Sequence, residues 1–288
     1  MTSLLEYQSS APPGYNNGYA HSAGASVLPK RWRGLIGAWM PVFGPTGLVL
    51  RDVSGNGTHG TLQDMDPATD WVIGNNARLP GYTLNLDGSN DQVALGNPSI
   101  LKPARFTIMA WAKLLSGHGT FPKLLAWNSD TIGWQLYLNT SGADKYEFRL
   151  GGLQIAGTNN TLDVWIHLAG TYDGANAKLY DNGVNTKTVA TTTDPDYTGA
   201  TRLDIGDRGT EARRWKGPVA SVLIFNRALT ANEVYEHYTD TLGMFCLSSQ
   251  PYFSAPDVVA GRVMSSLAYR GGLAAEGGIA GIGGGLAG

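Results

Sequence analysis

The sequence predicts an all-β protein, a two-layer antiparallel sandwich with one short helix near its C-terminal end. Charged residues make up only 15% of the chain and Gly accounts for 39 of its 288 residues, a composition typical of a turn-rich β protein. Apolar segments of strand length alternate with turn signals at intervals typical of sandwiches. A hydrophobic content of 42% is enough for a proper core.

The strand signals follow one another along the middle of the chain. Residues 106–114 (FTIMAWAKL) and 219–225 (VASVLIF) are apolar on both faces, which indicates central strands. Residues 146–150 (YEFRL) alternate apolar and charged side chains, as in a strand with one solvated face. Residues 165–174 (WIHLAGTYDG) form a further strand that ends in a Gly turn.

A hairpin and a helix complete the pattern. Residues 177–189 contain Asn182-Gly183, the pair that a type I′ turn prefers because both positions need a positive φ. Residues 229–243 (LTANEVYEHYTDTLG) predict the helix. Thr230 and Glu233 form a capping box at its start, and Gly243 can end it.

The two ends of the chain differ from the middle in composition. Residues 1–33 are rich in Pro, Gly, Ser, Asn and Tyr and predict an extended arm, and residues 34–245 hold the patterned sequence. Residues 246–288 form a Gly-rich extension with scattered Leu, Ile and Val, which is too apolar for an ordinary disordered linker. We expect both ends to be held by neighbouring subunits in a large assembly.

Five segments in order carry a resemblance to a known family: LVLRDVSGNGTHGTL, LNLDGSNDQVAL, FTIMAWAKL, DVWIHLAGTYDGANAKLYDNG and GPVASVLIFNRALTANEVYEHY. Over residues of about 35–245 the chain resembles laminin-G-like, concanavalin A-like jelly-roll domains. The resemblance implies two antiparallel sheets of six or seven strands packed face to face. It also implies two candidate functions, carbohydrate binding and, less directly, glycoside hydrolysis.

Bulk properties exclude several partners. A net charge of −2 gives no electrostatic reason to bind nucleic acid or an anionic membrane. No apolar run reaches the roughly 20 residues of a membrane-spanning helix. The first residues lack the basic and apolar regions of a secretory signal peptide. Cys246 is the one cysteine, so no disulfide forms within the chain.

The stretch RDVSGNGTHGTL (residues 51–62) has two interpretations. Asp52 and Asn56 bond to backbone amides in a self-capped turn, or they bind calcium, which relatives of this fold often carry at a loop of carboxylates. Asp87 and Asp91 in DGSNDQ are the other tentative calcium ligands. Ala220 and Ser221 replace an acidic pair that is common in the family, which weakens the calcium interpretation.

The sequence predicts no catalytic residues. The jelly-roll hydrolases carry a Glu-x-Asp-x-(x)-Glu run that presents two carboxylates to one cleft, and no such run occurs here. Glu147 is expected to be a solvated strand residue, His167 a packed one and Cys246 a small buried side chain. We therefore expect a protein that is not an enzyme.

The candidates for glycan binding are aromatic and cationic residues near predicted loops: Trp215, Arg213, Arg214, Trp134 and Tyr197. Trp215 lies in RGTEARRWKG, where Arg and Lys side chains surround it and suit an acidic glycan or an acidic protein patch. The alternative is a solvated loop with one anchoring Trp.

These observations lead to a prediction of function. Laminin-G-like domains with Gly-rich ends resemble bacteriophage structural proteins, so the leading prediction is a virion protein, a capsid decoration or a head or tail appendage. Residues 1–33 and 246–288 would bind other virion proteins and copies of the chain, and the sandwich would display a glycan-binding surface. The alternative is a bacterial carbohydrate-binding or adhesion module, extracellular or at the cell surface by a non-classical route, and a glycoside hydrolase is a more distant one.

Overall fold

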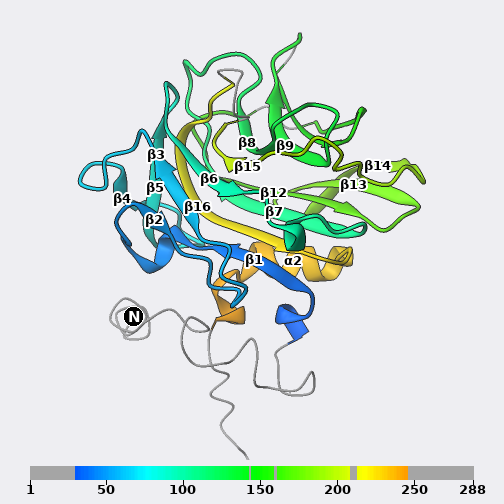
Figure 1. The fold of residues 1–288 in the computed structure, drawn as a ribbon, viewed down its shortest axis with the longest axis horizontal. Helices are drawn as coiled ribbons and strands as arrows, with labels where there is room; N and C mark the ends of the chain where they lie inside the picture. The colour runs from blue at the N-terminus through cyan, green and yellow to red at the C-terminus, as the bar shows by residue number, and fades with distance from the viewer. Residues whose placement is uncertain (1–29, 143, 159–160, 208–212, 246–288) are drawn as a thin grey trace, which may run out of the picture. The chain divides into compact units, whose positions relative to one another are not determined.

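A computed structural model describes residues 30–245 except 143, 159–160 and 208–212. These residues form a jelly-roll sandwich of two antiparallel sheets, A and B (Figure 1). Sheet A has eight strands in the order β14-β13-β12-β7-β16-β5-β4, with β1 paired to β16, and sheet B has eight in the order β11-β10-β9-β8-β15-β6-β3-β2.

The elements have the following bounds. Sheet A contains β1 (Leu35–Trp39), β4 (Trp71–Gly74), β5 (Gly81–Asp87), β7 (Phe106–Ala112), β12 (Ile166–Tyr172), β13 (Asn176–Asp181), β14 (Val184–Ala190) and β16 (Lys216–Phe225). Sheet B contains β2 (Val49–Leu50), β3 (Gly60–Gln63), β6 (Gln92–Gly96), β8 (Lys123–Trp127), β9 (Trp134–Asn139), β10 (Lys145–Leu150), β11 (Leu153–Ala156) and β15 (Leu203–Ile205). The helical segments are η1 (Lys30–Trp32), η2 (Pro41–Phe43), η3 (Ser99–Leu101), α2 (Ala231–Thr239) and η4 (Leu242–Met244).

The main core lies between the inner faces of the two sheets. Phe106 of β7 contacts Trp134 of β9, with ring centroids 5.8 Å apart, and Phe148 of β10, at 6.0 Å. All three side chains are fully buried. These contacts join strands of different sheets, because every second side chain of a strand points to the same face.

A second apolar cluster covers the outer face of sheet A. Trp111 of β7 stacks on Tyr238 of α2, with ring centroids 5.6 Å apart, and Phe225 of β16 contacts His237 at 5.3 Å. In Figure 1, α2 and β1 lie on one side of the sandwich and β8, β9 and β15 of sheet B lie on the other. The central strands of sheet A are therefore buried on both faces, as the apolar segments 106–114 and 219–225 predict.

The predicted local signals are confirmed. Asn182 and Gly183 have φ values of +51° and +79° and join β13 to β14. The capping box of Thr230 and Glu233 is present at the start of α2. Each sheet has eight strands rather than six or seven, because short edge strands such as β2 are too brief to leave a pattern.

The sandwich begins before residue 34, where the predicted arm ends. The indole Nε1 of Trp32 donates a hydrogen bond to the carbonyl of Met244, and its ring contacts Phe245 with centroids 5.3 Å apart. Residues 30–33 of the predicted arm therefore belong to the sandwich. Residues 1–29 and the extension 246–288, with Cys246, lie outside the described residues.

No helix of the described residues has the length and apolarity needed to cross a membrane.

Candidate functional site

The outer face of sheet B is polar. Along β9, Leu136 and Leu138 point into the core, so Gln135, Tyr137 and Asn139 point outward. The same alternation along the neighbouring strands gives a continuous surface, which we call the polar face. It consists of Gln92, Lys123, Gln135, Tyr137, Glu147, Arg149 and Asp204 on the strands, together with Asp130, Arg202, Asp207, Arg213 and Arg214 from adjoining segments.

The strand register sets the order of these side chains across the sheet. Arg149 of β10 lies opposite Gln135, Gln135 lies opposite Ala126 of β8, and Ala126 lies opposite Asp204 of β15. The small side chain of Ala126 leaves room above the sheet at this point. The loop of residues 128–133 folds back over it, because Gln135 Nε2 donates to the carbonyl of Ser129 at 2.6 Å.

Asp130, in that loop, is the centre of an ionic cluster. Its carboxylate lies 3.1 Å from Lys123 Nζ, 3.0 Å from a guanidinium nitrogen of Arg149 and 3.2 Å from one of Arg213. The Lys123 side chain is completely buried, whereas Asp130 is 29% exposed. Three cations from β8, β10 and the segment before β16 therefore converge on one carboxylate at the surface.

Tyr137 lies beneath these cations. Lys123 Nζ is 3.6 Å and the Arg149 guanidinium carbon 5.3 Å from the centroid of its ring, in the arrangement of cation–π contacts. Its hydroxyl donates to Glu147, and Asn139 Nδ2 donates to the same carboxylate at 2.9 Å. Burial, with the neighbouring Glu147 carboxylate second, raises the pKa of Tyr137 above its usual range.

The predicted role of Glu147 as a solvated residue is wrong. The residue is only 4% exposed, and its carboxylate accepts hydrogen bonds from Tyr137 and Asn139 of β9. The alternation in residues 146–150 identifies the face correctly, but it does not show that the face is covered by its own long side chains.

Two further carboxylates, Asp204 and Asp207, lie at the other side of the polar face. Asp204 is bonded to Arg202 Nε at 2.6 Å, and Asp207 to Arg214 Nε at 3.3 Å. Gly206 between them has a φ of +89°, and a Cβ there would lie 1.9 Å from Leu86 Cδ2. Because Gly206 adopts this left-handed backbone conformation, the side chains no longer alternate between the two faces of the sheet at this point. Asp204 and Asp207 therefore both bond to arginines of the polar face.

The pKa of Asp204 is raised to about 6. Burial is the main cause, because it disfavours the charged carboxylate, and the nearby Asp207 adds to it. Arg202 opposes this rise without cancelling it. The carboxylate is completely buried although it faces outward from the sheet.

Four buried atoms of the polar face have no hydrogen-bond partner among the described residues: Gln135 Oε1, Arg149 Nε, Asp204 Oδ1 and Asp207 Oδ1. Buried polar atoms are normally paired, so ordered water or a ligand group is a suitable partner for these four atoms. Three of the four are acceptors, and they need hydroxyl or amine donors.

Two of the three predicted aromatic ligand contacts are not at the surface. Trp215 and Trp134 are completely buried in the core between the sheets, and the Tyr197 hydroxyl is bonded to Trp134 Nε1 at 3.0 Å and to the carbonyl of Pro103 at 2.9 Å. Buried rings offer no face to a sugar, so the stacking role predicted for Trp215 and Trp134 is wrong, whereas Tyr197 is only partly buried. Arg213 and Arg214, in contrast, lie on the polar face.

The turn at residues 51–62 is self-capped. Asp52 Oδ1 accepts from the amides of Ala38 at 3.0 Å and Ser54 at 2.9 Å, and Oδ2 accepts from the amide and hydroxyl of Thr58 at 3.0 and 2.7 Å. Asn56 donates through Nδ2 to the carbonyl of Ile36 at 3.2 Å. Donor groups surround this carboxylate where a cation would need oxygen atoms.

The second tentative calcium pair also closes its own turn. Asp87 Oδ1 accepts from the amide of Ser89 at 2.6 Å, and Asp91 Oδ2 accepts from the amide of Asp87 at 2.8 Å. Burial and the carboxylate of Asp87 raise the pKa of Asp91 to about 6. The two pairs belong to different turns, and the described residues contain no group of three or more His, Cys, Asp or Glu side chains placed to hold a metal.

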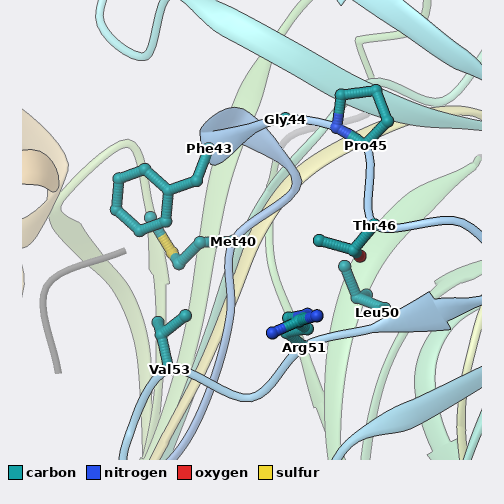
Figure 2. A pocket seen from close by; sticks show the side chains of 8 residues that line it. All are labelled: Met40, Phe43, Gly44, Pro45, Thr46, Leu50, Arg51 and Val53. Atoms are coloured by element: carbon teal, nitrogen blue, oxygen red, sulfur yellow. The ribbon is translucent and has the colours of Figure 1, made fainter. Parts of the chain in front are cut away.

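A small apolar pocket of about 160 Å³ lies elsewhere, between η2 and β2. Figure 2 shows Met40, Phe43 and Val53 on one side of it and Thr46 and Leu50 on the other. None of the predicted site residues lines it.

Asp130, Arg149, Gln135 and Asp204 were not among the sequence candidates. Polar residues at every second position in 135–139 and 145–149 are the local signal for Gln135 and Arg149, and Asp130 and Asp204 have no such signal. Their meeting depends on the order of strands β10, β9, β8 and β15, which joins segments far apart in the sequence.

Comparison with known proteins identifies the family. A laminin G family model, described as the concanavalin A-like lectin/glucanases superfamily, matches residues 87–235, just over half of the chain. No curated protein sequence matches the chain.

Solved structures with this fold are similar at low sequence identity. Domain 4 of AbnA, a GH43 extracellular arabinanase from Geobacillus stearothermophilus solved in complex with arabinotriose, is 20% identical, with a TM-score of 0.53 over 70% of this chain and 97% of that one. The binding domain of Paraclostridial Mosquitocidal Protein 1 is 18% identical, with a TM-score of 0.54 over 73% of this chain and 52% of that one.

Trypanosoma rangeli sialidase is 16% identical, with a TM-score of 0.51, and the match covers 84% of this chain but only 38% of the sialidase. At these identities the likeness shows the fold. Together with the family match, it establishes that this chain belongs to the concanavalin A-like lectin/glucanase superfamily.

Proposed function

We propose that this protein is a non-catalytic glycan-binding protein and that the polar face is its binding surface. The observation that carries the proposal is the set of four buried, unpartnered polar atoms on that face. The non-catalytic part rests on the sequence, which contains no Glu-x-Asp-x-(x)-Glu run.

The chemistry of the face suits saccharides. Asp204 and Asp207 each use one carboxylate oxygen for an arginine, and the other oxygen is buried without a hydrogen-bond partner among the described residues. A sugar hydroxyl can donate to such an oxygen and accept from the adjacent guanidinium, which satisfies both groups at once. Gln135, two strands from Asp204 and thus about 10 Å away, offers a third acceptor to a neighbouring ring.

The similar structures agree with this proposal. The arabinanase domain was solved with arabinotriose bound, and the mosquitocidal protein domain is a binding domain. The ligand of a similar structure is not assigned to this chain, because the chain's own residues define the candidate surface.

The test is binding to a glycan array, followed by the variant Asp204→Asn. We expect wild-type protein to bind a defined set of saccharides and the variant to lose about tenfold in affinity, the effect of one hydrogen bond to a charged group. Asp194→Asn is the matched control, because Asp194 pairs with Arg105 beside Tyr172 of sheet A and not on the polar face. Equal binding by both variants would contradict the assignment of the face, and hydrolysis of a bound saccharide would contradict the non-catalytic part.

A second candidate function, display on a virion, has its own supporting observation. Trp32 and Phe245 border the two terminal segments and contact each other in the cluster on the outer face of sheet A. Attachment through both ends would therefore start from the face opposite the polar face and leave the polar face exposed. Copies of the chain and other virion proteins would be the partners of the ends.

Sedimentation of a native lysate from the source, with detection of the chain by mass spectrometry, tests this second function. Many copies in virus-sized particles would support a structural role. Recovery only among slowly sedimenting proteins would contradict it and favour a separate binding or adhesion module.

A further inference from the structure

We propose that the polar face recognises saccharides that carry a carboxylate, and that Asp130 occupies the place of the ligand's carboxylate in the unliganded protein. This inference rests on the proposed function and adds the chemical class of the ligand. It follows from the geometry of the Asp130 cluster, which is built from three separate segments of the chain.

The cluster has the form of an anion site. Nitrogen atoms of Lys123, Arg149 and Arg213 lie 3.0 to 3.2 Å from the Asp130 carboxylate and approach it from different segments of the chain. Planar guanidinium groups match carboxylates geometrically, so arginines are the usual side chains for this recognition.

Each of the three cations also has an aromatic contact that does not involve Asp130. Lys123 and Arg149 both lie over the ring of Tyr137, at 3.6 and 5.3 Å from its centroid, and Arg213 lies 5.1 Å from the ring of Phe121. These aromatic contacts fix the cations before any ligand arrives. A ligand carboxylate that replaces Asp130 therefore meets a preorganised site.

Asp130 is the most exposed member of the cluster. Its side chain is 29% exposed, in contrast to the completely buried side chain of Lys123. A rotation about the Cα–Cβ bond would turn the carboxylate to water, where it regains its hydration. The exchange of one carboxylate for another keeps the charge of the cluster unchanged.

An oxygen atom that can accept a hydrogen bond from a sugar hydroxyl lies next to the cluster. Gln135 Oε1 is buried, has no partner among the described residues and lies on the strand between Arg149 and Ala126. A sugar ring whose carboxylate reaches the cations would place a hydroxyl near this oxygen. Uronic acids and sialic acids both combine a carboxylate with hydroxyls on one ring.

A purely structural role of Asp130 and a competing role predict different changes in the affinity for acidic saccharides when its charge is removed. If Asp130 only holds the 128–133 loop, removing its charge weakens or leaves unchanged the binding of every saccharide. If it competes with the ligand, removing its charge strengthens the binding of acidic saccharides alone.

The experiment is calorimetric titration of the full chain at pH 7 and low salt. The probes are trigalacturonate and its methyl ester, which has the same rings without charge, 3′-sialyllactose and lactose, and arabinotriose. We expect Asp130→Asn to raise the affinity for trigalacturonate or 3′-sialyllactose about tenfold, in the range of charge-pair couplings at interfaces, and to leave the neutral probes unchanged. Asp194→Asn, the matched control, should change neither.

The outcomes separate this inference from the proposed function. Binding of neutral probes with no preference for acidic ones, or acidic binding that Asp130→Asn lowers or leaves unchanged, would overturn the inference and leave the proposed function standing. Absence of binding to the array and to all five probes would overturn both. The two acidic probes identify which acid is the ligand.

Arg213→Gln tests the same point if Asp130→Asn does not fold. The Arg213 side chain is 26% exposed, more than those of Lys123 and Arg149. We expect about tenfold weaker binding of the acidic probe and unchanged binding of its neutral counterpart. An equal loss for both probes would overturn the inference.

Discussion

Asp52 illustrates how one carboxylate can organise a turn. It is 1% exposed and accepts four hydrogen bonds, from the amides of Ala38, Ser54 and Thr58 and the hydroxyl of Thr58. One of these bonds reaches back to β1, so the side chain joins the turn to the sheet. The oxygen-rich spacing of residues 51–62 is thus explained by hydrogen bonds within the protein.

We expect Asp52→Ala to lower the free energy of unfolding by about 3 kcal/mol, since it leaves buried amides without an acceptor. Urea denaturation measures this change. Excess chelator should leave the melting temperature of the wild-type protein unchanged. A clear drop in chelator would restore calcium binding as the role of this turn, and Asp66→Ala, in an exposed turn, is the control for a general effect of removing an aspartate.

At the scale of elements, the β13–β14 hairpin and α2 depend on each other. The turn at Asn182-Gly183 lies against the helix, because a Cβ at Gly183 would lie 2.9 Å from Tyr238 Cδ1 and 3.0 Å from Tyr235 Cδ2. Tyr238 in turn stacks on Trp111 of β7. Gly183 is therefore required for two reasons: its φ is positive, and the helix leaves no room for a Cβ at this position.

The variant Gly183→Ala separates these two requirements when it is compared with Gly57→Ala. Gly57 has a similar φ of +71°, but a Cβ there would meet nothing within 4 Å. We expect a loss of about 1 kcal/mol for Gly57→Ala from the backbone alone and about 1 kcal/mol more for Gly183→Ala from the crowding. Chemical denaturation measures both, and equal losses would contradict a packing role of the helix against this turn.

At the scale of the whole molecule, buried titratable groups determine how stability depends on pH. Burial lowers the pKa of His167 to about 3 and that of His237 to about 4. The unfolded chain, with ordinary histidines, binds protons first as the pH falls below about 6.5, so these residues cost stability in acid. Asp91 and Asp204, whose pKa values are raised to about 6, act in the opposite direction below that pH.

A histidine variant isolates the first contribution. At pH 5 the proton taken up by an unfolded His237 should cost about 2 kcal/mol relative to pH 8. In His237→Phe this part of the pH dependence should disappear, so the stability difference between pH 8 and pH 5 changes by that amount. His118→Phe, outside the helix cluster, is the control, and an unchanged difference in His237→Phe would contradict the assignment.

The arrangement of the whole sandwich separates two surfaces. The outer face of sheet A is covered by α2 and the residues that border the terminal segments, whereas the outer face of sheet B carries the polar face. A protein attached by its ends would therefore present sheet B outward. This separation suits both the glycan-binding proposal and its virion variant.

Much of the fold could be predicted from local patterns. Residues 106–114 and 219–225 predict central strands, Asn182-Gly183 predicts the hairpin, and Thr230 with Glu233 predicts the start of α2, because each of these features acts over a few neighbouring residues. The candidate site could be predicted only in part. Arg213 and Arg214 were identified, but Trp215 and Trp134 were assigned to the surface although they fill the core.

The sequence by itself determined the class of fold and its family, since alternation, turn residues and caps are short-range properties. It did not determine which strands are neighbours, and the binding surface depends on that order. Asp130 meets Lys123 within one hairpin, but it meets Arg149 and Arg213 only because β10 pairs with β9 and the segment before β16 lies beside β8. Tertiary structure alone decided where these charges converge and which aromatic rings are hidden, because both depend on contacts between residues far apart in the chain.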